Sequence, residues 1–332
     1  MRSPVAKLLG MALGVAVVWG CSEALSPVRL FDGPIAKTID PRCCPNDAGS
    51  GCFCPPTLVG SSNGTGDTAG VAIYLERNLI CPARLLASGG APLLNGEPWP
   101  DTVMVYIAVD SGGEGNHLLN RAVTLSVTGV DSLGGGSDAP YGHMHVGVNG
   151  VVKPIGSLSN ATVNTGPNGL ITLSYRASEV SGPITISAQS VGAIANKVDL
   201  AVGVPGLLPQ IARPSDSLIG YTTIHPNNHS GIPIMLAKLD TLADDFLGQY
   251  GQRIQFNDMA LPLGGKFDLD TVWSQFGHPH AEHRAGRDLD ARTVVMTQAQ
   301  INWTRLRWSL LGGSSILHTV QPHLHLRYRG LE

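Results

Sequence analysis

Short runs in which apolar residues alternate with polar ones dominate the middle of the chain. They extend from about residue 58 to residue 205 and are separated by turns rich in Gly, Asn, Asp and Ser. This pattern is typical of β-strands, because successive side chains point to opposite faces of a strand. The clearest predicted strands are Thr102–Val109, Ala122–Val130, Leu170–Arg176, Pro183–Gln189 and Val198–Val204. We therefore predict an all-β sandwich over residues 58–205.

The hydrophobic period changes after a Pro- and Gly-rich stretch at residues 204–214. Five apolar residues then recur at helical spacing, with acidic residues between them: Leu236, Leu239, Leu242, Phe246 and Leu247. This spacing predicts an amphipathic helix, and residues 301–311 predict a second one. The C-terminal third of the chain therefore contains helices, unlike the region before it.

Two strands are predicted in the same C-terminal third. Residues 288–295 alternate in part, and residues 323–329 alternate strictly between polar and apolar side chains. A chain of 332 residues is long enough for two domains. We therefore predict a linker at residues 206–215 and a separate α+β domain at residues 216–332.

The N-terminal residues have the pattern of an export signal. Arg2 and Lys7 supply positive charge, and residues 8–19 form an apolar stretch that is too short to span a bilayer. A cysteine follows at Cys21, as in the lipobox of bacterial lipoproteins. We predict a signal peptide at residues 1–20, a membrane anchor through lipidated Cys21, and a location in the periplasm, on a membrane or at the cell surface. Cleavage beyond Cys21 without lipidation is the alternative.

A segment dense in Cys, Gly, Pro and Asn occupies residues 21–57. Beyond Cys21 the chain has five more cysteines: Cys43, Cys44, Cys52, Cys54 and Cys81. Exported thiols usually oxidise, so we expect a disulfide-stapled loop rather than a metal site, with the pairing left open.

The charge balance argues against a nucleic-acid partner. The chain has 22 basic and 25 acidic residues, a net charge of −3, and no run of Lys or Arg. Binding to a phosphate backbone requires a basic patch or stripe. We therefore expect no nucleic acid among the partners.

Histidine is the residue type that points to chemistry. Six of the eleven histidines lie close together near the C-terminus: His278, His280, His283, His318, His323 and His325. Such clustering is typical of a metal site or a proton relay. The segment from His283 to Asp290 reads as a loop entering a strand, in which Gly286 lets the imidazole fold back over the carboxylate. A His and an Asp are two of the ligands that a catalytic zinc requires.

The second element of this cluster is His323-Leu324-His325. On a strand, residues i and i+2 point to the same face with Cα atoms roughly 6.5 Å apart, so both imidazoles can converge on one site. The pair can supply two ligands, or one ligand and one base, and the residue types do not choose between these. Outside this cluster, we assign a structural role to His143 and His145 and turn positions to His225 and His229.

The pattern H-x-x-H-x-x-G-x-D-x-D from His280 to Asp290, followed by H-x-H at residues 323–325, resembles a known family. It is similar to the metallopeptidases of the lysostaphin, D-Ala-D-Ala peptidase and Hedgehog superfamily, and most closely to the penicillin-insensitive murein endopeptidases. Residues 257–265 are similar to the phrase that precedes the first histidine in those enzymes. The resemblance covers residues 255–329, a quarter of the chain.

This resemblance implies that His283, Asp290 and His325 hold Zn²⁺, and that His323 is the general base or stabilises the transition state. The motif places four further residues in the cleft or behind the ligands: His280, Asp288, Arg284 and Asp258. Asp288 either orients a ligand imidazole or pairs with Arg284 or Arg287.

A second resemblance concerns the sandwich. The turn Thr165–Gly169 and the strand after it resemble the hairpin-and-strand phrase of bacterial immunoglobulin-like surface modules. This resemblance implies an immunoglobulin-like sandwich that serves as a spacer or as a binding unit.

Together, these patterns predict an exported zinc metallopeptidase of the murein endopeptidase or D-Ala-D-Ala carboxypeptidase type. Its substrate would be the peptide of bacterial peptidoglycan, hydrolysed by zinc-activated water. The alternative is a non-catalytic cell-surface binding protein, or a structural lipoprotein, that retains a peptidase-like zinc domain.

Overall fold

The structure is a computed structural model. It describes residues 59–62, 68–83, 85, 93–94, 97–98, 100–111, 116–129, 155–220, 228–268, 279–280 and 283–328, all of which belong to one compact unit. Some predictions concern residues outside these ranges: the signal peptide, Cys21, the Cys-rich segment at 21–57, His143, His145, His225 and His278. Within the described ranges, no helix is both long enough and apolar enough to cross a membrane.

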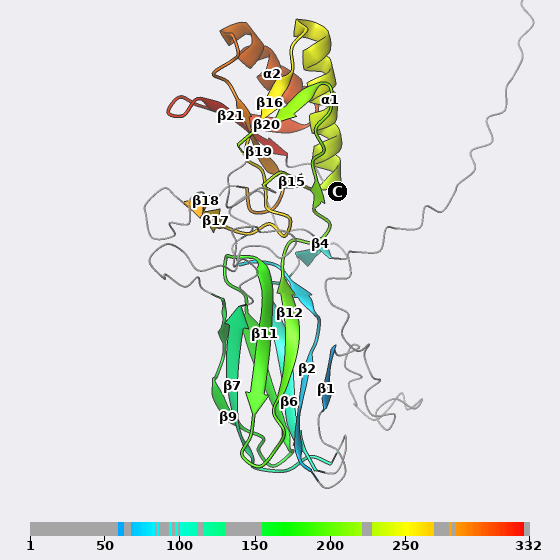
Figure 1. The fold of residues 1–332 in the computed structure, drawn as a ribbon, viewed down its shortest axis with the longest axis vertical. Coiled ribbons are helices and arrows are strands. Elements are labelled where there is room, and N and C mark those ends of the chain that lie inside the picture. The colour runs from blue at the N-terminus through cyan, green and yellow to red at the C-terminus, as the bar shows by residue number, and fades with distance from the viewer. Residues whose placement is uncertain are drawn as a thin grey trace, which may run out of the picture. The chain divides into compact units, whose positions relative to one another are not determined.

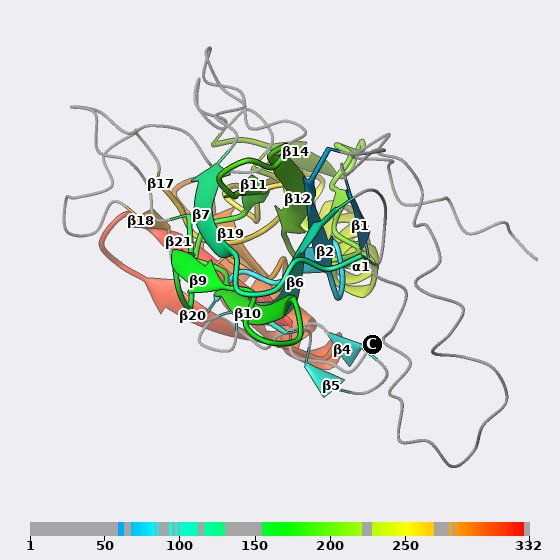
Figure 2. The same cartoon turned by 90° about the horizontal axis from the view of Figure 1, so that it is seen from below.

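Two five-stranded sheets form a sandwich in the first half of the described chain. One sheet has the order β1 (Val59–Ser62), β2 (Gly70–Leu75), β6 (Thr102–Asp110), β10 (Leu170–Arg176) and β8 (Ser157–Leu158). The other has the order β3 (Leu79–Ile80), β12 (Asn196–Val202), β11 (Gly182–Gln189), β7 (Ala122–Gly129) and β9 (Thr162–Asn164). Figure 1 gives the side view, and Figure 2 views these strands nearly end-on. A separate pair joins β4 (Leu93–Leu94) to β5 (Glu97–Pro98).

The sandwich core follows from the alternation along its strands. In β7, Val123 and Leu125 are buried while the residues between them are exposed, and β10 repeats this with Ile171 and Leu173. Tyr175 is fully buried, and its hydroxyl donates a hydrogen bond to the carbonyl of Ile155. The five strands predicted for this region are confirmed to within a few residues at their ends.

The predicted hairpin at Thr165–Gly169 is wrong in one respect. The turn exists, but β9 before it pairs with β7 in one sheet, and β10 after it pairs with β6 in the other. The turn therefore passes between the two sheets. A tight turn signal marks the change of direction but not the partner of each strand, because pairing depends on the rest of the sandwich.

The C-terminal part has its own five-stranded sheet and the two helices. The sheet order is β14 (Asp216–Leu218), β16 (Ile254–Phe256), β19 (Asp288–Arg292), β21 (His323–Tyr328) and β20 (Gly313–His318). The helices are α1 (Pro233–Tyr250) and α2 (Gln298–Leu310). Two short pairs join β13 (Leu208–Pro209) to β15 (Ser230–Gly231), and β17 (Phe267–Asp268) to β18 (Pro279–His280). Both predicted helices are confirmed, and the predicted linker contains β13.

The helices cover one face of this sheet. Leu289 of β19 and Leu324 of β21 are buried in one core with Phe246 of α1 and Trp308 of α2. Because side chains alternate along a strand, the polar residues of β19 and β21 point to the opposite face. The candidate site lies on that face.

The predicted strand at residues 288–295 ends earlier, at Arg292. Met296 N donates to Thr293 O across a turn, which leaves Val294 and Val295 exposed. The turn leads directly into the capping box of α2, in which Thr297 accepts a hydrogen bond from Gln300 N. Val294 and Val295 therefore belong to the turn that leads into α2 and not to β19.

We expect replacement of Thr297 with alanine to lower the free energy of unfolding by about 1 kcal/mol. The Thr297 hydroxyl satisfies the Gln300 N–H, which has no partner within the helix. Urea denaturation followed by circular dichroism measures the change. The control is Thr241→Ala, which removes an exposed hydroxyl that bonds only within α1.

Candidate metal centre

The loop that carries His283 is fixed by backbone hydrogen bonds. Ile232 N donates to Gly286 O at 2.9 Å, and Tyr328 N donates to Arg287 O at 2.8 Å. Gly286 has a φ of 66°, a left-handed conformation that glycine adopts without strain. The chain then enters β19 at Asp288, which confirms the predicted loop-to-strand path. This turn brings the buried His283 ring back to Asp290.

Asp290 and His325 lie directly opposite each other on β19 and β21. His325 Nδ1 is 2.8 Å from Asp290 Oδ1, and His283 Nε2 is 3.4 Å from Asp290 Oδ2. One ligand atom from each of the three residues lies within 4.8 Å of the others, and all three residues are buried. The structure therefore brings together the three residues that the resemblance implies as metal ligands.

Backbone contacts of the strand hold Asp290 in place. Asp290 N donates to Asp258 O at 3.0 Å, and Asn257 N donates to Asp290 O at 2.6 Å. The Asp258 carboxylate accepts hydrogen bonds from the amides of Asn228 and Asn257. Asp258 thus supports the strand beside the cluster through its backbone.

Asp288 lies behind His325. Its Oδ1 is 3.3 Å from His325 Nε2 and 3.3 Å from Arg327 Nε. A carboxylate at Nε2 fixes the orientation of the imidazole and leaves Nδ1 for the centre of the cluster. Asp288 therefore contacts both a histidine of the cluster and an arginine, which is Arg327.

The charges of the cluster compensate one another. Burial disfavours the charged form of His283, but Asp290 and Asp288 outweigh burial and raise the pKa of His283 to about 9. Burial also acts against the Asp290 carboxylate, but His283 and His325 outweigh it and hold the pKa of Asp290 well below its usual value. Burial disfavours the charged form of His325 as well, but the hydrogen bonds that its ring donates to Asp288 and Asp290 raise its pKa. The carboxylates therefore attract positive charge to this point, as protons or as a divalent cation.

His323 lies beside the three buried residues and is partly exposed to solvent. Its side chain is 21% exposed, and Nε2 lies 3.6 Å from Asp290 Oδ1. Nδ1 lies 2.6 Å from the carbonyl of Gln321, which accepts the proton of that nitrogen. In a neutral imidazole with its proton on Nδ1, the other nitrogen, Nε2, carries the lone pair. In His323 this nitrogen faces Asp290.

His318, for which the sequence predicts no role of its own, also lies in the cluster. His318 is the cross-strand partner of His323, and the two rings stack with centroids 4.5 Å apart and planes 15° apart. Its ring is also 6.0 Å from that of His325. The pairing of β20 with β21 brings His318 to the cluster. A hairpin predicted between these two strands would have indicated from the sequence that His318 lies beside His323.

The remaining candidates lie elsewhere. The guanidinium of Arg284 contacts Glu179, with Nη2 3.1 Å from Oε2. His280 lies on β18 and pairs with Phe267. His229, predicted in a turn, is buried, and burial lowers its pKa to about 4, so it is a neutral core histidine. Cys81 is a buried thiol, free of any disulfide to a described residue.

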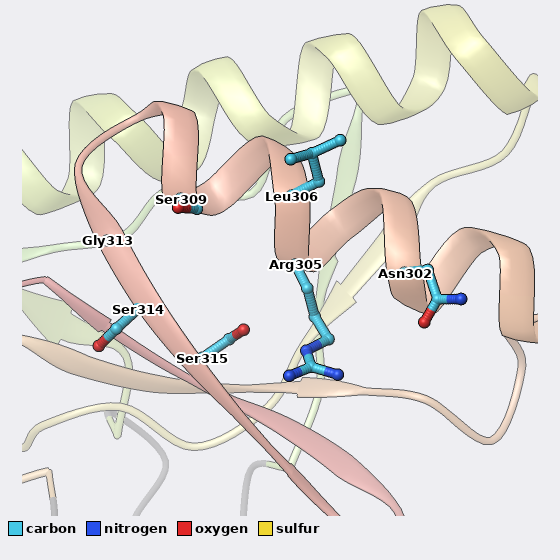
Figure 3. A pocket seen from close by; sticks show the side chains of 7 residues that line it. All are labelled: Asn302, Arg305, Leu306, Ser309, Gly313, Ser314 and Ser315. Atoms are coloured by element: carbon cyan, nitrogen blue, oxygen red, sulfur yellow. The ribbon is translucent and has the colours of Figure 1, made fainter.

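A pocket of about 420 Å³ lies between α2 and β20, away from the histidines. Figure 3 shows the Arg305 side chain extending from α2 toward the strands, on the side of β20 where Ser315 lies. None of the predicted ligands lines this pocket.

No protein-family model matches the sequence, and no curated protein matches it. The similar solved structures include domains of bacterial adhesins. The D0-D1 domain of intimin is 18% identical with a TM-score of 0.25, over 41% of this chain and 49% of that one. The D00-D0 domain of intimin is 15% identical with a TM-score of 0.26, over 42% and 50%. The Yersinia pseudotuberculosis adhesin InvE is 9% identical with a TM-score of 0.28, over 43% and 34%.

The chain thus spans half or less of the length of these structures. The two-sheet sandwich rests on the strand pairing described above.

Proposed function

We propose that the C-terminal part of this chain is a zinc metallopeptidase domain that hydrolyses peptide bonds of bacterial peptidoglycan. The observation that carries the proposal is the convergence of His283, Asp290 and His325 from separate segments, with His323 beside them. The order and spacing of these residues support it through their resemblance to murein endopeptidases.

The donor set suits zinc. Zinc accepts two imidazoles and one carboxylate as ligands. Catalytic zinc sites have three protein ligands and keep the fourth position for water or substrate. Asp288 Oδ1 contacts the second ring nitrogen of His325, as the carboxylate partners of zinc-bound histidines do. When bound, zinc supplies Lewis-acid polarisation of a carbonyl and activates water at neutral pH.

Each residue of the cluster would have its own role in the reaction. His283, Asp290 and His325 would hold the metal, and Asp288 would orient His325. His323 would take a proton at Nε2, because the Gln321 carbonyl keeps the other proton on Nδ1.

The N-terminal pattern supports an exported protein. We propose that residues 1–20 direct export and that lipidated Cys21 anchors the chain to a membrane of the cell envelope, where peptidoglycan is accessible.

A second candidate is a non-catalytic cell-surface protein in which the metal stabilises a binding domain. The burial of the ligands favours it: His283 is 1%, Asp290 5% and His325 0% exposed. The partly exposed side chains at this cluster belong to His323 and His318, which are not among the three converging residues.

Zinc content and peptidoglycan hydrolysis separate these candidates. For the purified protein we expect about one zinc ion per chain and release of muropeptide fragments that a chelator stops and added zinc restores. The matched control is His117→Ala, which removes a histidine that contacts Asp110 at 2.6 Å in the sandwich. Zinc without hydrolysis would favour the second candidate, and absence of zinc would reject both.

A further inference from the structure

We infer that the β-sandwich holds the loop that carries His283, with Glu179 as the positioning residue; the link to zinc rests on the proposed function. Glu179 lies in the turn between β10 and β11. Its Oε2 is 3.1 Å from Arg284 Nη2 and 3.3 Å from Lys266 Nζ. Arg284 directly follows His283, so this carboxylate fixes the residue next to a proposed ligand.

The Glu179 contacts are shielded from water. The side chain of Glu179 is 19% exposed and that of Arg284 is 8% exposed. An exposed ion pair contributes little to stability, whereas a pair that is mostly buried is screened less by water and salt. Loss of the Glu179 charge should therefore displace Arg284 and the loop with it.

Backbone hydrogen bonds join the same three segments. Lys266 N donates to Glu179 O at 2.7 Å, and Gly265 N donates to Arg284 O at 2.8 Å. The Ser181 hydroxyl donates to Gly264 O at 2.6 Å and is buried. Residues 264–266 are thus bonded to the sandwich turn through Glu179 and Ser181, and to the metal loop through Arg284.

The close approach of these segments depends on two consecutive glycines. Gly264 and Gly265 have φ values of 65° and 77°. A Cβ atom at Gly264 would lie 2.5 Å from Arg284 O, and one at Gly265 would lie 2.8 Å from Ser181 N. Only glycine permits this packing, since both atoms met by the added carbon belong to the backbone.

Apolar packing holds the loop as well. Ala285 is 1% exposed and packs in one buried cluster with Cys81 and Leu85 of the sandwich side and with Val204. The two residues after His283 are therefore anchored, one by charge and one by packing. A ligand held in this way is preorganised for the metal, so the sandwich is a structural part of the centre and not only a spacer.

The test uses the full chain with Glu179→Gln, which keeps the shape of the side chain and removes its charge. The matched control is Asp245→Asn, which breaks the Arg307–Asp245 pair between α1 and α2, far from the loop. Two quantities are measured: hydrogen exchange of residues 283–287 in metal-free protein, and zinc affinity by competition with a chromophoric chelator. We expect faster exchange of the loop and about tenfold weaker zinc binding in Glu179→Gln, with neither change in the control.

A double-mutant cycle tests whether Glu179 acts on the loop through Arg284. If Glu179 acts through Arg284, Glu179→Gln should add little to the loss that Arg284→Gln causes alone. Unchanged loop exchange in Glu179→Gln would overturn the inference, and so would additive effects in the cycle. If the parent protein binds no zinc but loop exchange still rises, the sandwich holds the loop and the zinc function is rejected.

Discussion

Replacing His325 with alanine is expected to abolish zinc binding and, with it, peptidoglycan hydrolysis. His325 Nδ1 lies 2.8 Å from Asp290 Oδ1, and its other nitrogen is held by Asp288. The variant would keep two protein ligands, His283 and Asp290, and a zinc site of this kind requires three. Zinc content after dialysis should fall from about one ion per chain to background. Muropeptide release should fall to background as well.

Because His325 is fully buried, its loss also opens a cavity, so folding must be checked. Circular dichroism should give the same secondary structure for His325→Ala as for the parent. His325→Gln, which fills more of the space, should lose zinc to a similar extent. His117→Ala removes a histidine–aspartate contact in the sandwich and should keep both zinc and activity. A folded His325→Ala protein that retains stoichiometric zinc would contradict the ligand assignment.

Replacing His323 with alanine is expected to leave the zinc in place and to slow turnover by roughly 10² to 10⁴-fold. His323 is not among the three residues whose ligand atoms converge. Its Nε2 lies at 3.6 Å from Asp290 Oδ1, and its Nδ1 is held by the Gln321 carbonyl, an arrangement suited to proton transfer. Metal content and muropeptide release are measured on the same preparation, so that turnover is expressed per bound zinc.

The outcome for His323→Ala separates a base from a ligand. Loss of zinc in His323→Ala, together with its retention in His325→Ala, would reverse the two roles. Unchanged turnover per zinc would remove His323 from the mechanism. If both variants keep zinc and the parent hydrolyses nothing, the non-catalytic surface protein becomes the better proposal.

The local pattern of the sequence was enough for both helices and for seven of the strands that the structure describes. Alternation predicted β6, β10 and β21, and helical spacing predicted α1 and α2, because these periods reflect which face of each element is buried. The local pattern did not predict which strands pair with each other or where one strand ends. The turn at Thr165–Gly169 passes between sheets, and the strand from Asp288 ends at Arg292 because the next residues turn toward the cap of α2.

The sequence by itself determined which residues are candidate ligands, since the His–Asp and His-x-His spacings are visible without a structure. The tertiary structure decided how they meet. The register of β19 with β21 places Asp290 opposite His325, and a slip of one residue would turn one of them to the helix-covered face. Pairing of β20 with β21 brings His318 onto His323, and packing against the sandwich brings Glu179 to Arg284. The Asp290–His325 and Glu179–Arg284 contacts join residues far apart in sequence, so no local pattern encodes them, whereas the His318–His323 contact follows from the hairpin of β20 and β21.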